Sequence, residues 1–130
     1  MTQSVAKRGD RIVGEDIHVV LVNTPSGAVP TPTPMPFDGS LAGGLSSRVH
    51  AESEPVALVG SEASNAAPHV PISGTFQKPP TNRGSVVQGS TRVLVEGKPI
   101  ARDGDLAVTC NDPADLPGAR VVAAGRVVAG

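Results

Sequence analysis

Large aromatic side chains are almost absent from this 130-residue chain, which has two phenylalanines and neither tryptophan nor tyrosine. A core of valine, alanine, leucine and isoleucine buries little area per residue, so such a domain needs another source of stability, for example a metal or a partner. Without tyrosine or tryptophan, the chain has no stacking platform for single-stranded nucleic acid. Substrate pockets usually contain aromatic side chains, so their scarcity also argues against an enzyme.

An excess of one charge, long apolar runs and paired cysteines are missing too. The formal net charge is −1, from 11 basic and 12 acidic residues, so we expect no basic surface for nucleic acid. The one cysteine excludes an internal disulfide. Residues 1–14 are polar where a signal peptide would be apolar, and no segment has membrane-spanning length. We therefore expect the protein to be made and folded in the cytoplasm; if it leaves the cell, a route other than general secretion carries it.

Proline and glycine, by contrast, are abundant, with 13 and 15 residues. They divide the chain into short apolar segments, which is typical of strands. Residues 10–23 and 106–110 are predicted strands, and residues 24–47 and 61–85 are predicted long loops. The alternating prolines in the first loop favour an extended polyproline conformation. Only residues 60–67 could form a helical turn, so the predicted class is all-β.

Three similar ten-residue segments predict three β-hairpins. They read RVHAESEPVA (48–57), RVLVEGKPIA (92–101) and RVVAAGRVVA (120–129), with turns at Ser53, Gly97 and Gly125. The Glu96-Gly97 pair supplies the positive φ that a two-residue hairpin turn requires. Three similar hairpins in one chain can imitate a three-fold axis, so we predict a small cone or pyramid of short strands with a pseudo-three-fold repeat.

The second segment also contains a recognisable motif. It continues as GKPIARDGD (97–105), in which Pro99-Ile100-Ala101-Arg102 is a variant of the sequence proline–alanine–alanine–arginine. Together with KRGD at residues 7–10, it resembles the PAAR-repeat proteins. These are small β-rich cones on the trimeric spike of type VI secretion systems and related phage-tail-like contractile injection machines. The resemblance covers nearly the whole chain, so residues 1–130 are expected to form a single PAAR-like domain.

The candidate metal ligands are the three histidines and the cysteine: His18, His50, His69 and Cys110. Four such ligands are what a closed tetrahedral zinc site requires, although no close ligand pair marks them. His18 interrupts the most apolar predicted strand, where an unpaired imidazole would be costly. His50 stands where the sister segments have Leu94 and Val122. The resemblance adds that PAAR domains hold a metal near the apex with three histidines and one cysteine, which implies Zn²⁺ or another divalent ion on these residues.

Two catalytic alternatives stay open on the residues alone. Three histidines around an open fourth position would make a hydrolytic zinc site, with Asp16, Glu52 or Asp112 as the base. Cys110 and a histidine could instead form a nucleophile pair, for which no third, orienting group is identifiable.

The function implied by the resemblance is structural and not enzymatic: the chain caps and sharpens the trimeric spike and helps to pierce the target envelope. One copy would bind a spike trimer through its wide end, effectors could attach non-covalently, and the target membrane would be contacted only transiently. A type VI system, an extracellular phage-like particle and a phage tail all fit. The alternatives from other classes are a small zinc-dependent hydrolase and a capping or adaptor domain of unrelated fold.

Overall fold

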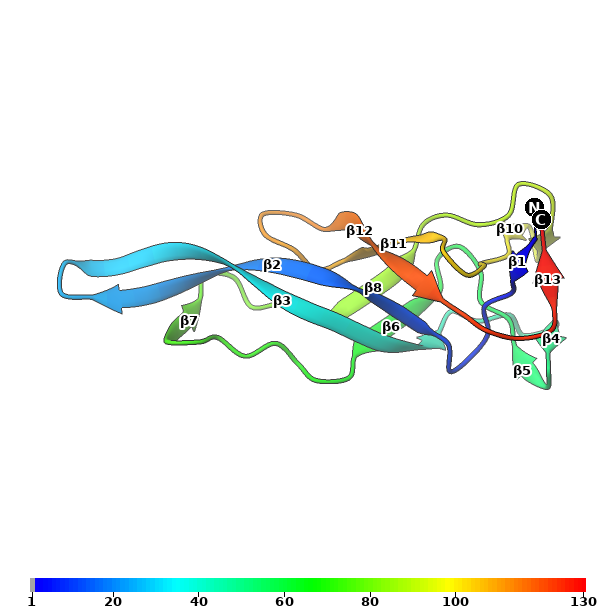
Figure 1. Ribbon diagram of the computed structural model, residues 1–130, viewed down its shortest axis with the longest axis horizontal. Helices are drawn as coiled ribbons and strands as arrows, with labels where there is room; N and C mark the ends of the chain where they lie inside the picture. The colour runs from blue at the N-terminus through cyan, green and yellow to red at the C-terminus, as the bar shows by residue number, and fades with distance from the viewer. Residues whose placement is uncertain (1) are drawn as a thin grey trace.

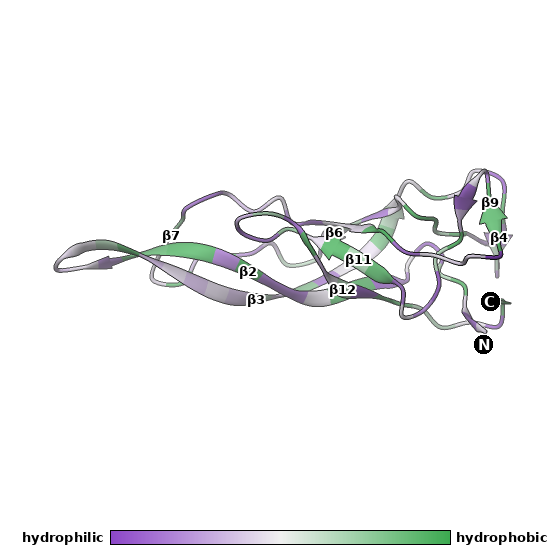
Figure 2. Ribbon diagram, turned by 90° about the horizontal axis from the view of Figure 1, so that it is seen from above, coloured by the Kyte–Doolittle hydropathy of each residue, from purple (hydrophilic) through white to green (hydrophobic). Residues whose placement is uncertain are grey.

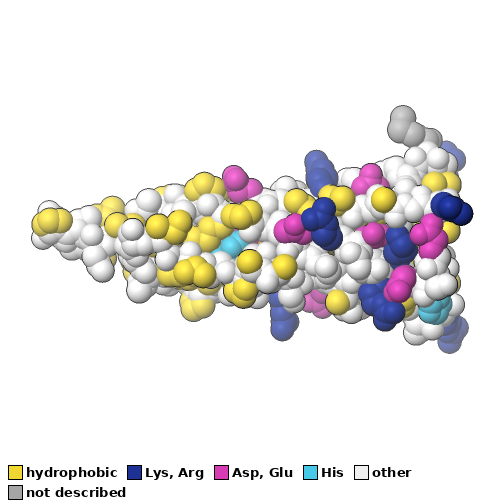
Figure 3. All heavy atoms as spheres, turned by 60° about the horizontal axis from the view of Figure 1, so that its bottom comes forward, with side chains coloured by type: hydrophobic (Ala, Val, Ile, Leu, Met, Phe, Trp, Pro, Cys, Tyr) yellow, Lys and Arg dark blue, Asp and Glu magenta, His cyan; other side chains and the backbone are white. Residues whose placement is uncertain are grey.

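The computed structural model describes residues 2–130, which form an elongated molecule that tapers from a wide end to a narrow tip (Figure 1; Figure 3). All regular secondary structure in this part of the chain is strand, so the predicted all-β class and cone shape are confirmed. No helix long and apolar enough to cross a membrane occurs among the described residues. Both ends of the described part of the chain lie at the wide end (Figure 1).

One sheet runs along the molecule. Its members are β2 (Arg11–Thr24), β3 (Gly27–Gly43), β6 (Glu62–Asn65), β7 (Gly74–Phe76), β8 (Arg83–Val86), β11 (Leu106–Thr109) and β12 (Leu116–Val122). The strand order is β12-β11-β8-β6-β3-β2-β7, and β12 also pairs with β2. The first six strands in this order therefore close into a ring, to which β7 is added. Beyond the ring, β2 and β3 continue as a long distal hairpin (Figure 1).

Three short two-stranded ladders form the wide end. They are β1 (Gln3–Ser4) with β13 (Val128–Ala129), β4 (His50–Ala51) with β5 (Glu54–Pro55), and β9 (Leu94–Val95) with β10 (Lys98–Pro99). A small apolar cluster underlies the ladders, and a larger one fills the ring. Phe37 is fully buried in the larger cluster. A Cβ at Gly84 would lie 3.2 Å from the Phe37 ring, so the glycine makes room for it.

Three alanines hydrogen bond in a cycle at the centre of the wide end. The Ala6 amide donates to the Ala101 carbonyl, Ala101 donates to Ala57, and Ala57 donates to Ala6, each at 2.9 Å. All three residues are fully buried. Each is followed three positions later by a glycine with positive φ: Gly9 (91°), Gly60 (97°) and Gly104 (86°). These repeated contacts define the pseudo-three-fold axis that the sequence repeats predict.

The third repeat, however, does not lie where the sequence predicts it. Residues 48–57 and 92–101 form the expected hairpins, whereas residues 120–129 divide between β12 and β13, and β13 pairs with β1 from the other end of the chain. Equivalent amide-to-carbonyl bonds set the register: Val56 to Val49, Ile100 to Val93 and Val5 to Val127. The third copy therefore begins at Arg126 and not at Arg120. The letters Arg-Val-Val occur at both places, and the earlier set is used in the ring.

The predicted loop at residues 24–47 is also wrong, because it contains β3, a strand of 17 residues. Proline lacks the amide that pairs strands, but here it stands at every second position, so every missing amide falls on the same edge. The other edge of β3 pairs with β2 from Gly27 to Ser40, which includes all four of these prolines. The second predicted loop, residues 61–85, likewise contains β6, β7 and most of β8, and residues 62–65 are strand instead of a helical turn.

Enlarging one alanine of the central cycle should destabilise the fold. Because Ala101 is fully buried on the axis, we expect Ala101→Leu to lower the free energy of unfolding by about 1–3 kcal/mol through overpacking. Denaturant unfolding would measure this loss. Ala42→Leu, at an exposed position of β3, is the matched control and should leave the stability near that of the parent. Equal stabilities for the two variants would contradict the assigned role of the cycle.

Candidate metal centre

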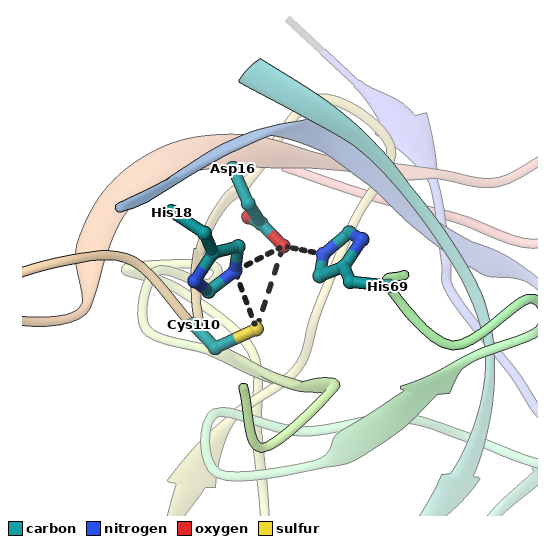
Figure 4. A group of neighbouring side chains, drawn as sticks. All are labelled: Asp16, His18, His69 and Cys110. Carbon is teal, nitrogen blue, oxygen red and sulfur yellow. Dashed lines mark hydrogen bonds and ion pairs between the residues drawn. The ribbon is translucent and has the colours of Figure 1, made fainter. Parts of the chain in front are cut away.

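Four polar side chains converge at the start of the distal hairpin (Figure 4). Asp16 and His18 come from β2, Cys110 directly follows β11, and His69 lies between β6 and β7. Their ligand atoms all lie within 4.8 Å of one another. The side chains of Asp16, His18 and His69 are at most 2% exposed, and Cys110 is 4% exposed. The group is therefore compatible with a metal ion bound out of contact with solvent.

Strand geometry explains how β2 supplies two of the four residues. Residues two apart on a strand point to the same face, and both Asp16 and His18 lie on the buried face of β2. His69 is held from its backbone, because its amide donates to Asn82 Oδ1 at 2.9 Å. Asn65 Nδ2 lies 3.4 Å from His69 Nδ1, which leaves Nε2 directed toward the group.

The Asp16 carboxylate is fixed through one oxygen and presents the other. Its Oδ1 accepts a hydrogen bond from the Thr109 hydroxyl. Its Oδ2 lies 2.7 Å from His69 Nε2 and 3.5 Å from Cys110 Sγ. Asn111 Nδ2 in turn lies 3.4 Å from Thr109 Oγ1. This arrangement leaves one oxygen of Asp16 facing the other donors.

His18 presents Nε2 to the same point. This atom is 3.6 Å from Cys110 Sγ and 4.0 Å from Asp16 Oδ2. Its other ring nitrogen, Nδ1, is buried and has no hydrogen-bond partner among the described residues. The nearest carboxylate is that of Asp112, whose Oδ2 lies 3.7 Å away and accepts the Val19 amide at 2.8 Å.

Burial sets the protonation of two of these groups. It lowers the pKa of His18, and the neighbouring His69 lowers it further, against opposing effects of Asp112 and Asp16. Burial raises the pKa of the Cys110 thiol, and the Asp16 carboxylate adds to that rise. Without a metal, the site therefore favours a neutral imidazole and a neutral thiol. A bound dication would instead favour the thiolate, because it supplies the positive charge that the site lacks.

Three of the four metal ligands predicted from the sequence, His18, His69 and Cys110, lie together in this group. The fourth, His50, lies outside it. That residue lies on β4 at the wide end, where it is exposed and pairs with Pro55. Its true counterparts, Leu94 and Val128, are 63% and 52% exposed. An aliphatic residue in the sister segments therefore did not indicate a buried position.

Asp16 completes the group in place of His50. The sequence suggested this residue only as a candidate base, because it lies close to His18. The signal that could have found it is the Asp-x-His spacing in a buried strand, which places both side chains on one face. Outside this group, Arg102 of the motif forms an ion pair within the domain: its Nη2 lies 2.8 Å from Asp105 Oδ1.

The lowered pKa of His18 predicts how the metal-free protein responds to acid. Protonation of His18 is less favourable in the folded state than in the unfolded chain, so its contribution to stability is complete above the ordinary histidine value of about 6.5 and is lost as the pH falls through the lowered pKa. Urea unfolding in the presence of a chelator, repeated across this range, should show the decrease. His18→Gln should reduce the pH dependence, whereas His50→Gln should retain it; identical curves for all three proteins would refute the assignment.

One comparison with known families covers the second part of the chain. Residues 77–129 match the family model described as PAAR motif, and no curated protein matches the chain. The matched segment includes the hairpin β9–β10, the buried Cys110 and the start of the third repeat at Arg126. Residues 5–10 and 56–61, outside it, carry the same alanine and turn glycine as residues 100–105. The resemblance of this chain to the PAAR-repeat proteins is thus confirmed by the match at residues 77–129.

Proposed function

We propose that this chain is a structural tip protein, which caps the trimeric spike of a contractile injection machine with its wide end. The observation that carries the proposal is the hydrogen-bonded cycle of Ala6, Ala57 and Ala101, found in a chain with a PAAR motif. A trimer presents three identical surfaces around an axis, and a single chain matches them best when its own contacts repeat around an axis. In this proposal residues 1–130 act as one PAAR-like domain, assembled in the cytoplasm and delivered outside with the machine.

The surface of the wide end supports docking of a partner. The exposed aliphatic residues there occupy matching positions of the three repeats: Val49, Leu94, Val127 and Val128, at 38%, 63%, 43% and 52% exposure. An exposed group of this kind is typical of a protein–protein contact. His50 takes the place of the third aliphatic beside Leu94 and Val128.

Contacts between neighbouring repeats hold this surface in place. Glu52, Glu96 and Gly130 occupy equivalent positions, and each accepts a hydrogen bond from the next repeat. The donors are the Arg126 amide at 2.6 Å, the Ser47 hydroxyl at 3.1 Å and the Ser90 hydroxyl, respectively. The three ladders are thereby joined into one base, which is what a rigid cap requires.

A charge placed on this base should prevent docking. We expect native mass spectrometry of the complex to show one chain on three spike subunits, and Val128→Asp to abolish the complex, because it would bury an unpaired carboxylate at the contact. Val29→Asp is the matched control, since Val29 is similarly exposed, at 46%, but lies near the end of the distal hairpin. A one-to-one or three-to-three complex, or equal binding by both variants, would contradict the proposal.

In the same proposal, Asp16, His18, His69 and Cys110 hold one divalent ion, for which zinc is the best candidate. The distances of 3.5 and 3.6 Å from Cys110 Sγ to Asp16 Oδ2 and His18 Nε2 suit neighbouring corners of a tetrahedron with bonds of about 2.0–2.3 Å. Asp16 Oδ2 and His69 Nε2, which are 2.7 Å apart, would have to separate to occupy two other corners. One carboxylate and one thiolate would balance the charge of a dication, which favours binding in a buried place. The Asp112 carboxylate, 3.7 Å from His18 Nδ1, would attract the ring proton to Nδ1 by its charge, so that Nε2 is free to bind.

The ion would contribute stability, not catalysis. Four buried donors fill a tetrahedral shell and leave no open position for water or substrate. Asp16, the candidate base of the hydrolase alternative, is itself one of those donors. A domain with two phenylalanines as its only aromatic residues benefits from the free energy of metal binding, which reaches about 10 kcal/mol in small zinc domains.

Substitutions of His50 and Asp16 distinguish the donor set in the structure from the one predicted by the sequence, because Cys110 belongs to both sets. We expect one equivalent of zinc in the parent and in His50→Ala, and loss of zinc with a lower melting temperature in Asp16→Asn and Cys110→Ser. Elemental analysis of the purified proteins and thermal unfolding would measure both effects. Loss of zinc from His50→Ala, with retention in Asp16→Asn, would restore the three-histidine set. Hydrolytic activity gained by Cys110→Ser would favour the enzyme alternative.

The distribution of charge supports a role for the narrow end in piercing the target envelope. Residues 17–37 and 64–77 contain no Asp, Glu, Lys or Arg, and the charged side chains gather over the wider part of the molecule (Figure 3). Figure 2 shows the apolar stretch of β2 in the distal hairpin. A tip without full charges can enter the apolar interior of a membrane without the large cost of desolvating them. In the same proposal, effectors attach non-covalently to a part of the chain other than the tip.

A further inference from the structure

The distal part of the β2–β3 hairpin has two long edges that could each accept another strand. Edge strands present unpaired amides and carbonyls, which makes them templates for pairing with another chain. The hairpin projects beyond the ring (Figure 1), so most of the sheet cannot cover its edges. β2 and β3 pair with each other along one edge, so each strand has one outer edge left to close.

The edge of β2 is closed by other parts of the chain. The Ile17 amide donates to Asn111 Oδ1 at 2.7 Å, and the Val19 amide donates to Asp112 Oδ2 at 2.8 Å. The carbonyls of the same two residues accept the amides of Asp112 and Gln77, at 2.8 and 3.0 Å. Farther along, residues 20–22 pair with β7.

These contacts also fix the direction of the β3 backbone. Ile17 lies opposite Pro34, and Val19 lies opposite Pro32. Because Ile17 and Val19 direct their amides and carbonyls away from β3, neither pair is hydrogen-bonded across the two strands. The backbone of both prolines therefore faces outward. Pro30 and Pro36 have the same parity along the strand and face the same way. All four prolines are exposed.

Proline thus occupies four consecutive outward positions of this edge. The next outward residue, Asp38, has an amide, and that amide donates to Asn65 Oδ1 at 3.1 Å. From Gly39 onward, β6 covers the edge. Prolines therefore occur where no other strand covers β3, and amides return where the edge is covered.

We infer that Pro30, Pro32, Pro34 and Pro36 close the free edge of β3 to strand addition, so that the tips of two copies cannot pair. This edge presents carbonyls over a length of roughly 20 Å, at about 3.3 Å per residue, and no amides between them. Two such edges brought together would oppose acceptor to acceptor, and a strand added from another protein would find only half of its hydrogen bonds. The inference does not depend on the proposed function.

The test restores the missing amides. Threonine suits exposed strand positions and already stands at residues 31 and 33, so we would replace the four prolines by threonine, together with the smaller pair Pro32→Thr and Pro34→Thr. The parent should remain a monomer by light scattering coupled to size-exclusion chromatography. The quadruple variant should double its mass as concentration rises, and the pair should do so at higher concentration. Hydrogen exchange should show the new amides protected only in the assembled form.

A second pair of prolines separates edge closure from a general effect of losing proline. Pro25→Thr with Pro79→Thr changes two exposed prolines outside the outward row and should leave the protein monomeric. If the quadruple variant does not fold, the Pro32 and Pro34 pair decides the question by the same two measurements. A monomeric pair with unprotected new amides at the highest concentration, or equal assembly by the control pair, would overturn the inference.

Discussion

Three amide-to-carbonyl hydrogen bonds, among Ala6, Ala57 and Ala101, are the constraint on which the wide end depends. They join segments that are far apart in the chain, and only small side chains fit where the three backbones meet. Once the cycle is formed, each segment leaves through a turn with a glycine at positive φ, and each of the three ladders precedes one of the alanines. The pseudo-three-fold base is therefore a consequence of backbone pairing at one buried point, supported by a thin aliphatic cluster.

The polar group at the start of the distal hairpin plays the corresponding role for the narrower part. Asp16 and His18 on β2 connect there with Cys110 after β11 and with His69 on the segment that leads to β7. The rings of His69 and Phe76 pack beside His18 at this point, with centroids 4.9 and 5.8 Å from that of His18. The proposed metal would join these three segments and offset the cost of burying such a polar group.

Beyond Val20, residues 21–34 of the hairpin are half-buried or exposed, so its edges decide its behaviour. On β2 the chain covers the edge with Asn111, Asp112 and β7, and on β3 it removes the amides by proline. The same segment lacks full charges, which would otherwise discourage strand pairing by repulsion. Proline therefore offers a way to protect the edge of a tip that is kept uncharged.

The sequence by itself determined the all-β class, two of the three repeats, the PAAR motif and three members of the polar group, because turn glycines, alternation and residue type are local signals. Tertiary structure decided the rest. Arg-Val-Val occurs at residues 120 and 126, and only pairing with β1 shows which copy continues the repeat. Strand β3 forms because its prolines share one edge, and that parity matters only once β2 lies on the other. Asp16 replaces His50 because burial depends on which face of a strand meets the core, and the letters of a sister segment do not record it.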